Sequence, residues 1–509
     1  MFATLRHIFR LLRTARVLAR HDALFFLEEA GIAPLPVRLL KWVSGVRAYG
    51  RPGERLARAL MALGPSFIKF GQSLAVRSDL IGDSVAADLS ALQARIPAFP
   101  AAAAIATVER ELDGPLDSFF EEFEETPVAA ASIAQVHFAR TTDGEAVAVK
   151  VLRPDIEAAF AHDLTFLLWI ARTLELFVPA SRRLRPVAVV EAFRGWVDDE
   201  LDLRMEAAAA SELAENFADD SGFHVPRVDW ARSARRVLTL ERVEGVPIDD
   251  TTRLAEAGLD GRAILERSAE AFFRQVFEHG FFHADMHPGN MFVAADGTLL
   301  PVDFGIMGRL DRPTRHYLAD MLVGFLTGDY RRVADVHFDA GYVPRHQSRA
   351  AFTQACRAIG EPIIGRPMNE ISLARLLAQL FEVTDRFQME TQPQLLLLQK
   401  TMLVAEGVGR RLDPDSNIWV VTQPLIESWM IANRGPQAQL RDAAERMAET
   451  VRNLPQLADG LSAMAGADGL RLHPDTVAAM RAPGKGPVRL AWPWLIAAAL
   501  GGILLGMLI

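Results

Sequence analysis

Three polar residues in the second half of the chain have types and spacing suited to one reaction, the transfer of a phosphoryl group. In FFHADMHPGN, residues 281–290, Asp285 lies five positions before Asn290, and Asp303 opens an Asp-Phe-Gly triplet thirteen positions further on. Phosphoryl transfer needs a carboxylate that orients or deprotonates the attacking hydroxyl or water, and hard oxygen ligands that hold magnesium against the phosphates. The pattern therefore predicts Asp285 as the catalytic residue and Asn290 and Asp303 as magnesium ligands. A turn followed by a strand end would explain any one of these residues, but not their joint spacing.

His283 and Ala284 show how this stretch relates to ordinary protein kinases, whose catalytic loop reads H-R-D-x-x-x-x-N. His283 matches that pattern, whereas Ala284 replaces the arginine that often pairs with a phosphate on the activation segment. After Asp303 there is no Ala-Pro-Glu triplet, and residues 311–325 already have a helical pattern. We therefore expect the metal- and phosphate-binding groups to be present and the peptide-docking segment to be short or absent.

A lysine upstream is the candidate for binding the nucleotide itself. Lys150 closes the β-branched segment AVAVK, where a kinase lysine that binds the α- and β-phosphates is expected. Such a lysine needs a carboxylate to hold it, and candidates lie in DDELDLRMEAAAA, residues 198–210, where Glu206 begins an Ala-rich helix. An isolated lysine at a strand end is commonly a solubilising residue, so this prediction depends on the rest of the site.

The loop that would cover the phosphates contains no glycine. It is predicted to bind ATP through Val128, Ala129, Ala130, Ala131, Ser132, Ile133, Ala134, Gln135 and Val136. Glycine lets backbone amides approach phosphates closely and adopt positive φ angles, and alanine permits neither so easily. We therefore expect a stiffer loop with a different grip on the phosphates. Taken alone, the alanine run would be interpreted as a helix.

Composition sets limits on the kind of protein. The chain has 509 residues, half of them hydrophobic, with a net charge of −9 and a pI of about 5.8. An acidic chain is not expected to bind nucleic acid. The single cysteine, Cys356, excludes an internal disulfide framework and a multi-cysteine zinc site. No third ligand at a zinc-like spacing accompanies His283 and His287, so we expect no transition-metal centre.

The order of the predicted elements indicates an α+β, protein-kinase-like fold with two lobes and an N-terminal helical extension. A short, turn-rich β segment with a hairpin signal at Asp143-Gly144 precedes a long helical part, as a small lobe precedes a large one. The predicted units are a basic helix in 1–34, the helical extension in 35–115, the small lobe in 116–245, the large lobe in 246–450, a linker in 451–489 and a transmembrane helix in 490–509.

Both ends of the chain suggest a membrane. Residues 490–509 carry no charge and are long enough to cross a bilayer as a helix, although a buried core helix is the alternative. Basic residues precede this segment, which predicts that the main body lies on the cytoplasmic face of a bacterial inner membrane. Near the N-terminus, Arg6, Arg10, Arg13, Arg16 and Arg20 recur every three or four residues. Such a stripe suits an anionic membrane surface or, alternatively, a solvated helix face.

Taken together, several motifs resemble the UbiB-like atypical kinases of the protein-kinase-like superfamily, over about residues 20–420. They are KFGQ (69–72), AAASIAQVH (129–137), VAVKVLRP (147–154), ELDLRMEAAA (200–209), FFHADMHPGN (281–290), VDFG (302–305) and LVAEGVGRRLDP (403–414). The family usually has Glu-Ala-Ala-Asn in the Ala-rich helix, where this chain has Ala209. The resemblance implies that Lys69 and Gln72, on the extension, meet Glu200 and Asp202 over the active site. It also implies that Glu206 pairs with Lys150, that ATP and magnesium are the cofactors, and that the extension fills the groove for a peptide substrate.

The resemblance further implies a membrane-anchored kinase or ATPase that supports ubiquinone biosynthesis by acting on, or helping to extract, prenylated quinone precursors. Its expected partners are membrane lipid, prenylated phenol or quinone intermediates, and other quinone-biosynthesis enzymes. Two alternatives remain open at this point: a small-molecule phosphotransferase, and a nucleotide-gated scaffold for those enzymes with little turnover. The motifs do not decide whether Lys69 inhibits or assists.

Overall fold

A computed structural model of the chain describes a limited set of residues. They are 2–25, 41, 49–75, 81–90, 97–177, 185–362, 379, 382–384, 386–389, 392–415, 424–426, 428–430, 432, 465–466 and 469–470. The chain divides into two compact units, Met1–Met430 and Ile431–Ile509. In the second unit the structure describes one short pair of strands, β11 (Ala465–Gly466) and β12 (Gly469–Leu470). All of the elements below belong to the first unit.

The small lobe is built on an antiparallel five-stranded sheet. Its strands are β1 (Phe120–Phe123), β2 (Ala129–Ala130), β3 (Ala134–Thr141), β4 (Ala146–Leu152) and β5 (Val237–Glu241), in the order β1-β3-β4-β5 with β2 beside β3. Helix α8 (Ala101–Glu111) packs on one face, where Val147, Val149 and Val151 are buried. Because side chains alternate along a strand, Lys150 is directed to the opposite face.

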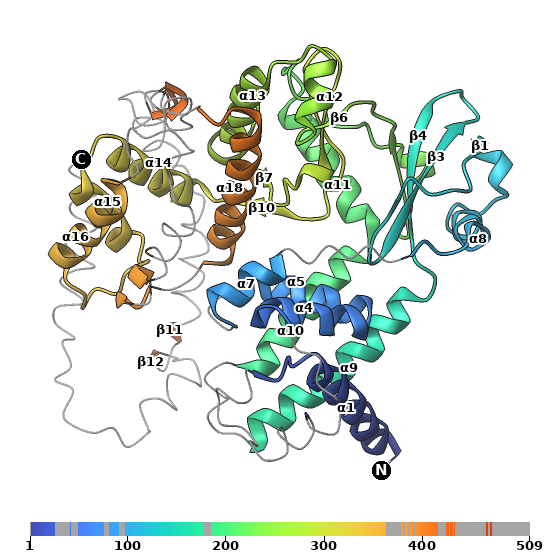
Figure 1. Ribbon diagram of the computed structural model, residues 1–509, viewed down its shortest axis with the longest axis horizontal. Helices are drawn as coiled ribbons and strands as arrows, with labels where there is room; N and C mark the ends of the chain where they lie inside the picture. Colours follow the sequence, from blue (N-terminus) through green and yellow to red (C-terminus); the bar gives the residue numbers. More distant parts are fainter. Residues whose placement is uncertain are drawn as a thin grey trace. The chain divides into compact units, whose positions relative to one another are not determined.

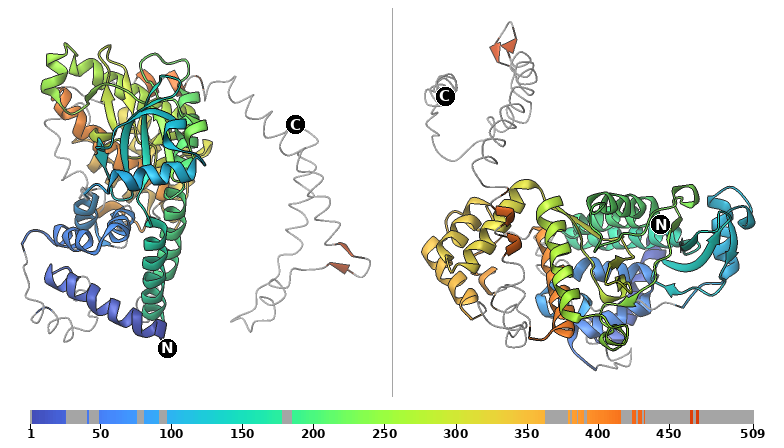
Figure 2. Two further views of the ribbon diagram at one scale, coloured as in Figure 1. Left: turned by 90° about the vertical axis from the view of Figure 1, so that its right-hand side faces the viewer. Right: turned by 90° about the horizontal axis from the view of Figure 1, so that it is seen from above.

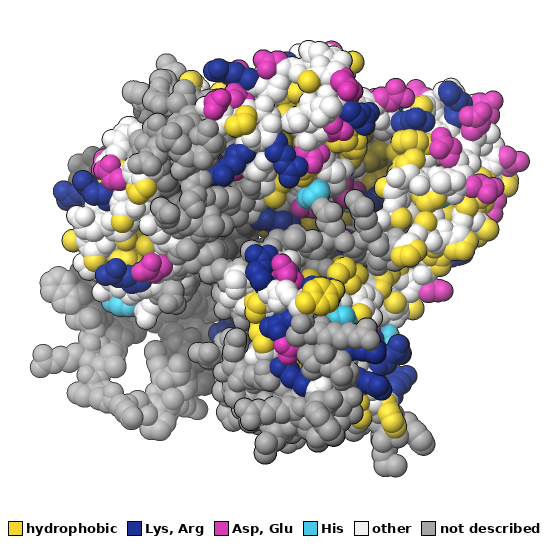
Figure 3. Space-filling view, viewed as in Figure 1, with side chains coloured by type: hydrophobic (Ala, Val, Ile, Leu, Met, Phe, Trp, Pro, Cys, Tyr) yellow, Lys and Arg dark blue, Asp and Glu magenta, His cyan; other side chains and the backbone are white. Residues whose placement is uncertain are grey.

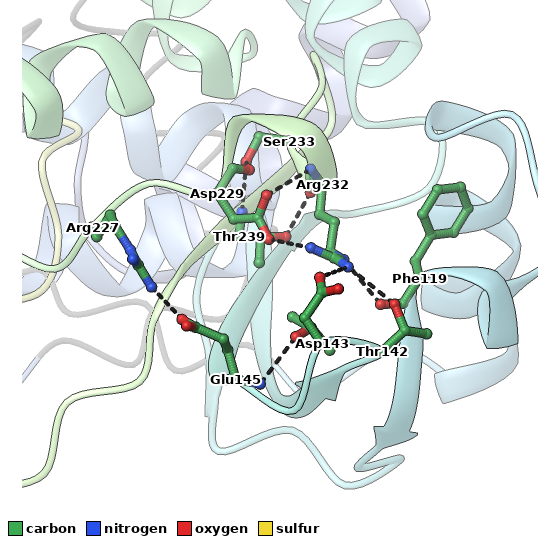
Figure 4. Close-up of polar contacts among 10 residues, drawn as sticks. Phe119, Thr142, Asp143, Glu145, Arg227, Asp229, Arg232, Ser233 and Thr239 are labelled. Atoms are coloured by element: carbon green, nitrogen blue, oxygen red, sulfur yellow. Dashed lines mark hydrogen bonds and ion pairs between the residues drawn. The ribbon is translucent and has the colours of Figure 1, made fainter.

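The turn between β3 and β4 forms where the sequence predicted a hairpin. Gly144 has a φ of +89°, a conformation that few residues other than glycine adopt, so the Asp-Gly signal has a physical basis. The guanidinium of Arg232, in the short 3-10 helix η3 (Trp230–Arg232), donates to Asp143 at 2.6 Å, to Asp229 at 2.8 Å and to the Phe119 carbonyl at 3.0 Å. Figure 4 shows this group of contacts, which ties the turn to the strands beside it.

The N-terminal extension and its supports are helical. They comprise α1 (Phe2–Arg20), α4 (Pro52–Leu63), α5 (Pro65–Ala75), α7 (Asp83–Ser90), α9 (Ile156–Phe177), α10 (Pro186–Glu200) and α11 (Leu203–Asn216). Gly64 ends α4 with a φ of +111°, and Pro65 starts α5. These helices share one hydrophobic core with part of the sheet, through residues such as Leu60, Ile68 and Phe193. In Figure 1, α4, α5 and α7 lie beside α10 and below α18.

The large lobe combines helices with short strand pairs. Its helices are α12 (Thr251–Glu256), α13 (Gly261–Phe273), the π-helical η4 (Arg274–His279), α14 (Arg312–Leu326), α15 (Tyr330–Asp339), α16 (Arg349–Gly360) and α18 (Pro393–Leu412). Its strands are β6 (Val246–Pro247), β7 (Phe281–His283), β8 (Met291–Val293), β9 (Leu299–Pro301) and β10 (Met307–Arg309), with β6, β8 and β9 in one sheet. The 3-10 turns η1 (Leu116–Ser118) and η5 (Pro288–Asn290) complete the described elements. β7 pairs with β10, which places the segment before Asp285 beside the segment after Asp303.

The membrane predictions fall largely outside the described part of the chain. The segment 490–509 and the linker 451–489, apart from the β11–β12 pair, are not among the described residues. No helix within the described ranges combines the length and apolarity needed to span a bilayer. Helix α1 is present, but Arg10 of its basic stripe binds Asp163 and the carbonyl of His162 on α9. Figure 2 shows α1 crossing the end of α9, so this arginine is used within the protein.

Candidate active site

Lys150 lies between two carboxylates in the region where the two lobes meet. Its ammonium donates to both oxygens of Glu206, at 2.7 and 2.9 Å, and lies 3.4 Å from Oδ1 of Asp303. Glu206 is in the first turn of α11, which is capped by Asp202. The ion pair implied by the family resemblance is therefore present, and Asp303 joins it. In Figure 3, basic, acidic and histidine side chains gather around a hollow in this region of the described surface.

The three charges of this group shift one another. Burial works against the charge of Lys150, but Asp303 and Glu206 outweigh it and hold the pKa of Lys150 above its ordinary value. Burial raises the pKa of Glu206 to about 7, against the attraction of Lys150 and with the help of the negative charge of Asp303. Burial also disfavours the charge of Asp303, yet Lys150 and the backbone N–H of Gly305 hold its pKa below the ordinary range. One lysine is thus shared by two carboxylates. Its single positive charge does not balance both of them, so a further cation can bind.

The catalytic-loop residues are positioned by the pairing of β7 with β10. His283 lies opposite Met307 in this ribbon, and the backbone N–H of Ala284 donates to Ile306 at 2.9 Å. The buried ring of His283 accepts the backbone N–H of Asp285 at Nδ1, 3.2 Å away. Burial lowers the pKa of His283, against the opposing charges of Asp303 and Asp285, so the ring is neutral at physiological pH. His283 therefore holds the backbone ahead of Asp285 and serves there as a hydrogen-bond acceptor.

Asn290 and Asp303 fit the donor set that magnesium prefers. The Asn290 amide nitrogen donates to the Asp285 carbonyl at 3.1 Å, which orients the amide and leaves its oxygen for a cation. Asp303 is held by the Gly305 N–H at 3.0 Å, and 45% of its side chain stays exposed. The described residues contain no cluster of three or more His, Cys, Asp or Glu side chains that could hold a metal ion. A magnesium ion bound here would therefore take further ligands from water and nucleotide phosphates, as Mg²⁺ commonly does.

The glycine-free loop is a tight β turn, so the helical interpretation of its alanine run is wrong. Ala129 pairs with Val136 and Ala130 with Gln135, which leaves residues 131–133 as the connection. Strand pairing overrides the helical propensity of alanine here. The guanidinium of Arg153 donates to the carbonyl of Ala131 at 3.0 and 3.2 Å, which supports the expectation of a stiff loop.

The nine loop residues differ in what they can offer a nucleotide. Val128 is exposed and Ala129 and Ala130 form the outer strand, whereas Ser132, Ile133, Ala134 and Gln135 are buried. The side chain of Gln135 binds the backbone of Phe99 at 3.0 and 3.3 Å and lies 2.8 Å from the His137 ring. Gln135 thus fastens the sheet to the segment before α8. ATP binding by this loop stays a prediction. Because most of the loop's side chains are buried, its backbone is the part suited to contact ATP.

Lys69 brings the extension into contact with the site. Its ammonium, on α5, binds Glu200 at the end of α10 and lies 5.3 Å from the centre of the Trp196 ring. The charge of Lys69 also helps to lower the pKa of Asp303. Gln72 follows Lys69 on the same helix. The contact implied between the two motifs is thus present for Lys69 and Glu200.

Asp202 has a structural role in the Glu-x-Asp motif. Its carboxylate accepts the backbone N–H of Arg204 at 3.2 Å and pairs with the Arg204 guanidinium at 2.6 and 2.8 Å. It thereby caps α11, and an acidic N-cap stabilises a helix by about 1 kcal/mol. Because α11 carries Glu206, Asp202 helps to hold the residue that binds Lys150.

Sequence reasoning missed Lys400. This residue is on α18, and its ammonium lies 3.0 Å from Oδ1 of Asp285. The chain contains fifty arginines but five lysines, Lys41, Lys69, Lys150, Lys400 and Lys485. Three of these five reach the candidate site. The scarcity of lysine was the signal in the sequence that could have drawn attention to position 400.

Comparisons with known proteins match the chain to kinase-like proteins. Residues 91–337 match the ABC1 atypical kinase-like domain, and residues 356–417 match the UbiB helical domain. The chain is 41% identical to a probable protein kinase UbiB of Marinobacter nauticus, over 88% of this chain and 83% of that protein. It is 42% identical to one of Pseudomonas aeruginosa, over 88% and 86%. A solved structure of Rv3197 with erythromycin, from Mycobacterium tuberculosis, is similar with a TM-score of 0.51 and 27% identity, covering 70% of this chain and 90% of that one.

Proposed function

This chain belongs to the UbiB family of ABC1 atypical kinases, and from that premise we propose that it is an ATP- and magnesium-dependent ATPase or kinase that supports ubiquinone biosynthesis at a membrane. The observation that carries the proposal is the cluster formed by Lys150, Glu206 and Asp303, with Lys150 between the two carboxylates. Asp285 and Asn290 adjoin each other, and the N–H of Val302, next to Asp303, donates to the Asn290 carbonyl at 3.0 Å. These residues come from the two lobes and from segments far apart in the sequence.

Each group has a distinct part in the proposed reaction. Lys150, held by Glu206, binds the α- and β-phosphates, while the oxygens of Asp303 and Asn290 hold magnesium. When bound, magnesium neutralises charge on the β- and γ-phosphates. Asp285 orients the attacking hydroxyl or water and takes up its proton. In ordinary kinases an arginine next to this residue links activity to phosphorylation, and the buried Ala284 provides no such link.

The acceptor in this proposal is water or a small molecule. The helical extension reaches the site through Lys69, which binds Glu200. The family resemblance implies that this extension fills the groove for a peptide substrate. The charge-free segment 490–509 would bring the site close to membrane-dissolved prenylated phenols. This last step, from ATP turnover to quinone precursors, rests on membership of the family.

The test is ATP turnover by the full chain reconstituted in vesicles, with and without a prenylated phenol. Wild type should hydrolyse ATP in a magnesium-dependent way, and Asp303→Asn should not. A phosphorylated phenol among the products would identify a small-molecule kinase, whereas phosphate release stimulated by the phenol would identify an ATPase. If Asp285→Asn restored ubiquinone synthesis in a strain that lacks the protein, the role would be that of a nucleotide-gated scaffold.

A further inference from the structure

We propose that Lys400 is a catalytic residue of this site, which contacts the γ-phosphoryl group of ATP during its transfer. The inference rests on the proposed function and extends it, because Lys400 lies in the UbiB helical domain, residues 356–417, and outside the kinase-like domain, residues 91–337. The active site would then be complete only when α18 is docked on the rest of the large lobe.

The geometry places the charge of Lys400 where the reaction occurs. Its ammonium pairs with Asp285 at 3.0 Å, and the two side chains keep 28% and 32% of their surface exposed. They are therefore ordered by each other and still open to a bound substrate. Two neighbours on α18 anchor the helix: Leu398 is buried in the core, and Thr401 is fully buried with its hydroxyl bonded to the Leu397 carbonyl at 2.9 Å.

The catalytic loop has no strong cation of its own. Residues 284–290 contain neither lysine nor arginine. The ammonium of Lys150 is bound by Glu206 and Asp303, and that of Lys69 by Glu200. The transferred phosphoryl group carries charge on three equatorial oxygens, and a positioned cation next to them is a large source of rate enhancement. Lys400 is the described cation that adjoins Asp285, so it is the group placed to supply this charge.

The packing explains why the cation comes from α18. Ala284 is fully buried, and it belongs to the same hydrophobic cluster as Leu398 of α18 and Phe282 of β7. An arginine at position 284 would have to put its long side chain into this packed region. The helix thus occupies the space beside the loop and brings a lysine of its own.

The choice of lysine at position 400 is itself informative. The chain uses arginine ten times as often as lysine, and its surface ion pairs are made almost throughout by arginine. Arginine offers a broad planar fork, whereas lysine is a compact point charge. A compact ammonium can leave one carboxylate oxygen for a phosphoryl oxygen through a small rotation of its side chain.

In hydrolysis, water attacks the γ-phosphoryl group. The oxygen of water forms a bond to the γ-phosphorus, and the bond from that phosphorus to the β–γ bridging oxygen breaks with its electron pair left on ADP. The proton of the water passes to Asp285 and then to solvent. Lys400 keeps its protons, moves from Asp285 toward the phosphoryl oxygens, and stabilises their charge.

The experiment compares Lys400→Met and Lys400→Arg with Arg411→Gln in the full chain in vesicles. Arg411 is a matched control, since it is on the same helix, eleven positions after Lys400, and makes an ion pair of 2.9 Å with Asp249. For Lys400→Met we expect ATP turnover to fall about 100-fold, as for loss of one donor to a transition state. ADP should bind within about threefold of wild type, the melting temperature should stay within about 2 °C, and Lys400→Arg should recover part of the rate. Arg411→Gln should turn over ATP within about twofold of wild type.

A second measurement makes the test independent of turnover. ADP with aluminium fluoride and magnesium imitates the transferred phosphoryl group, and Lys400→Met should weaken its trapping about 100-fold. If Lys400→Met traps this complex as tightly as wild type and turns over ATP within about threefold, the inference is overturned while the proposed function stands. If wild type binds no adenine nucleotide, the proposed function fails, and this inference fails with it.

Discussion

Two groups of charges in this protein are built in opposite ways. At the β3–β4 turn, Arg232 is surrounded by acceptors: two aspartates, the Thr142 hydroxyl at 3.1 Å and a backbone carbonyl. Between the lobes, Lys150 has two carboxylates that compete for one ammonium. The first group has its donors and acceptors matched. The second group is left with excess negative charge.

The difference between the two groups distinguishes a structural network from a candidate functional site. A network with matched donors and acceptors holds its charges in one arrangement and stabilises a turn. A network with unmatched charges has shifted pKa values, which are typical of sites that bind a cation or a phosphate. Figure 4 shows the matched network at the β3–β4 turn, and Figure 1 shows that β3 and β4 lie apart from β7 and β10. Substitutions in the two groups should therefore affect different measurements.

The largest effect should come from Asp303→Asn. Removal of a predicted metal ligand should lower ATP turnover by about 100- to 1,000-fold, or about 3–4 kcal/mol of transition-state stabilisation. The folded state should persist, since Lys150 keeps its contacts with Glu206. Turnover under saturating magnesium, with circular dichroism as the check on folding, measures this. Unchanged turnover would place the catalytic metal elsewhere.

The next effect is a pH dependence of stability that comes from Glu206. Its pKa is raised from an ordinary 4.5 to about 7 in the folded protein, so the folded state binds this proton more tightly than the unfolded chain does. The stabilising contribution is complete below about pH 4.5 and is lost as the pH rises through about 7, on the order of 3 kcal/mol in all. The lowered pKa of Asp303 makes stability depend on pH only below the ordinary value of 3.8, which is outside this window.

Denaturant unfolding of wild type and of Glu206→Gln across this pH range isolates the contribution of Glu206 to the free energy of unfolding. The wild-type free energy of unfolding should decline relative to that of the variant between about pH 5 and pH 8. Parallel curves for the two proteins would mean that Glu206 keeps an ordinary pKa.

A smaller effect is expected at the matched network. Arg232→Met removes hydrogen bonds to Asp143, Asp229 and the Phe119 carbonyl, and should lower the free energy of unfolding by about 2 kcal/mol. The affinity for ADP should change less than about twofold, since none of these groups belongs to the candidate site. Denaturant unfolding and nucleotide titration give both values. A loss of nucleotide binding would show that the two regions are coupled.

The smallest effect should be that of Arg227→Gln in the same neighbourhood. Arg227 binds Glu145, and both side chains are largely exposed, so the pair should contribute less than about 0.5 kcal/mol. Measured beside Arg232→Met, it tests whether burial and multiple partners give Arg232 its larger effect. Equal losses in the two variants would contradict that explanation.

Local patterns made much of the site predictable. Alternation along AVAVK directs Lys150 away from the buried valines of β4, and the spacing from His283 to Asp303 reflects one ribbon, β7 with β10, and the loop it supports. The Asp-Gly turn and the Gly-Pro break between α4 and α5 also follow from backbone preferences of single residues. The alanine run taken alone would suggest a helix, and its strand form depends on pairing with β3.

The contacts between residues far apart in the sequence could not be predicted from local patterns. Lys400 meets Asp285 over a separation of 115 residues, and Arg232 meets Asp143 over 89. A single helix or turn contains no information on which distant carboxylate it will reach. These pairs exist because apolar faces, such as that of Leu398 against the core of the large lobe, dock whole elements in one orientation.

By itself, the sequence determined which residues could perform phosphoryl transfer, since their chemistry and spacing are local properties of strands and loops. The tertiary structure decided which charges share one site: Lys150 with Glu206 and Asp303, Lys69 with Glu200, and Lys400 with Asp285. The physical reason is that burial of apolar surface sets the placement of helices, and polar side chains then meet the partners that this placement provides.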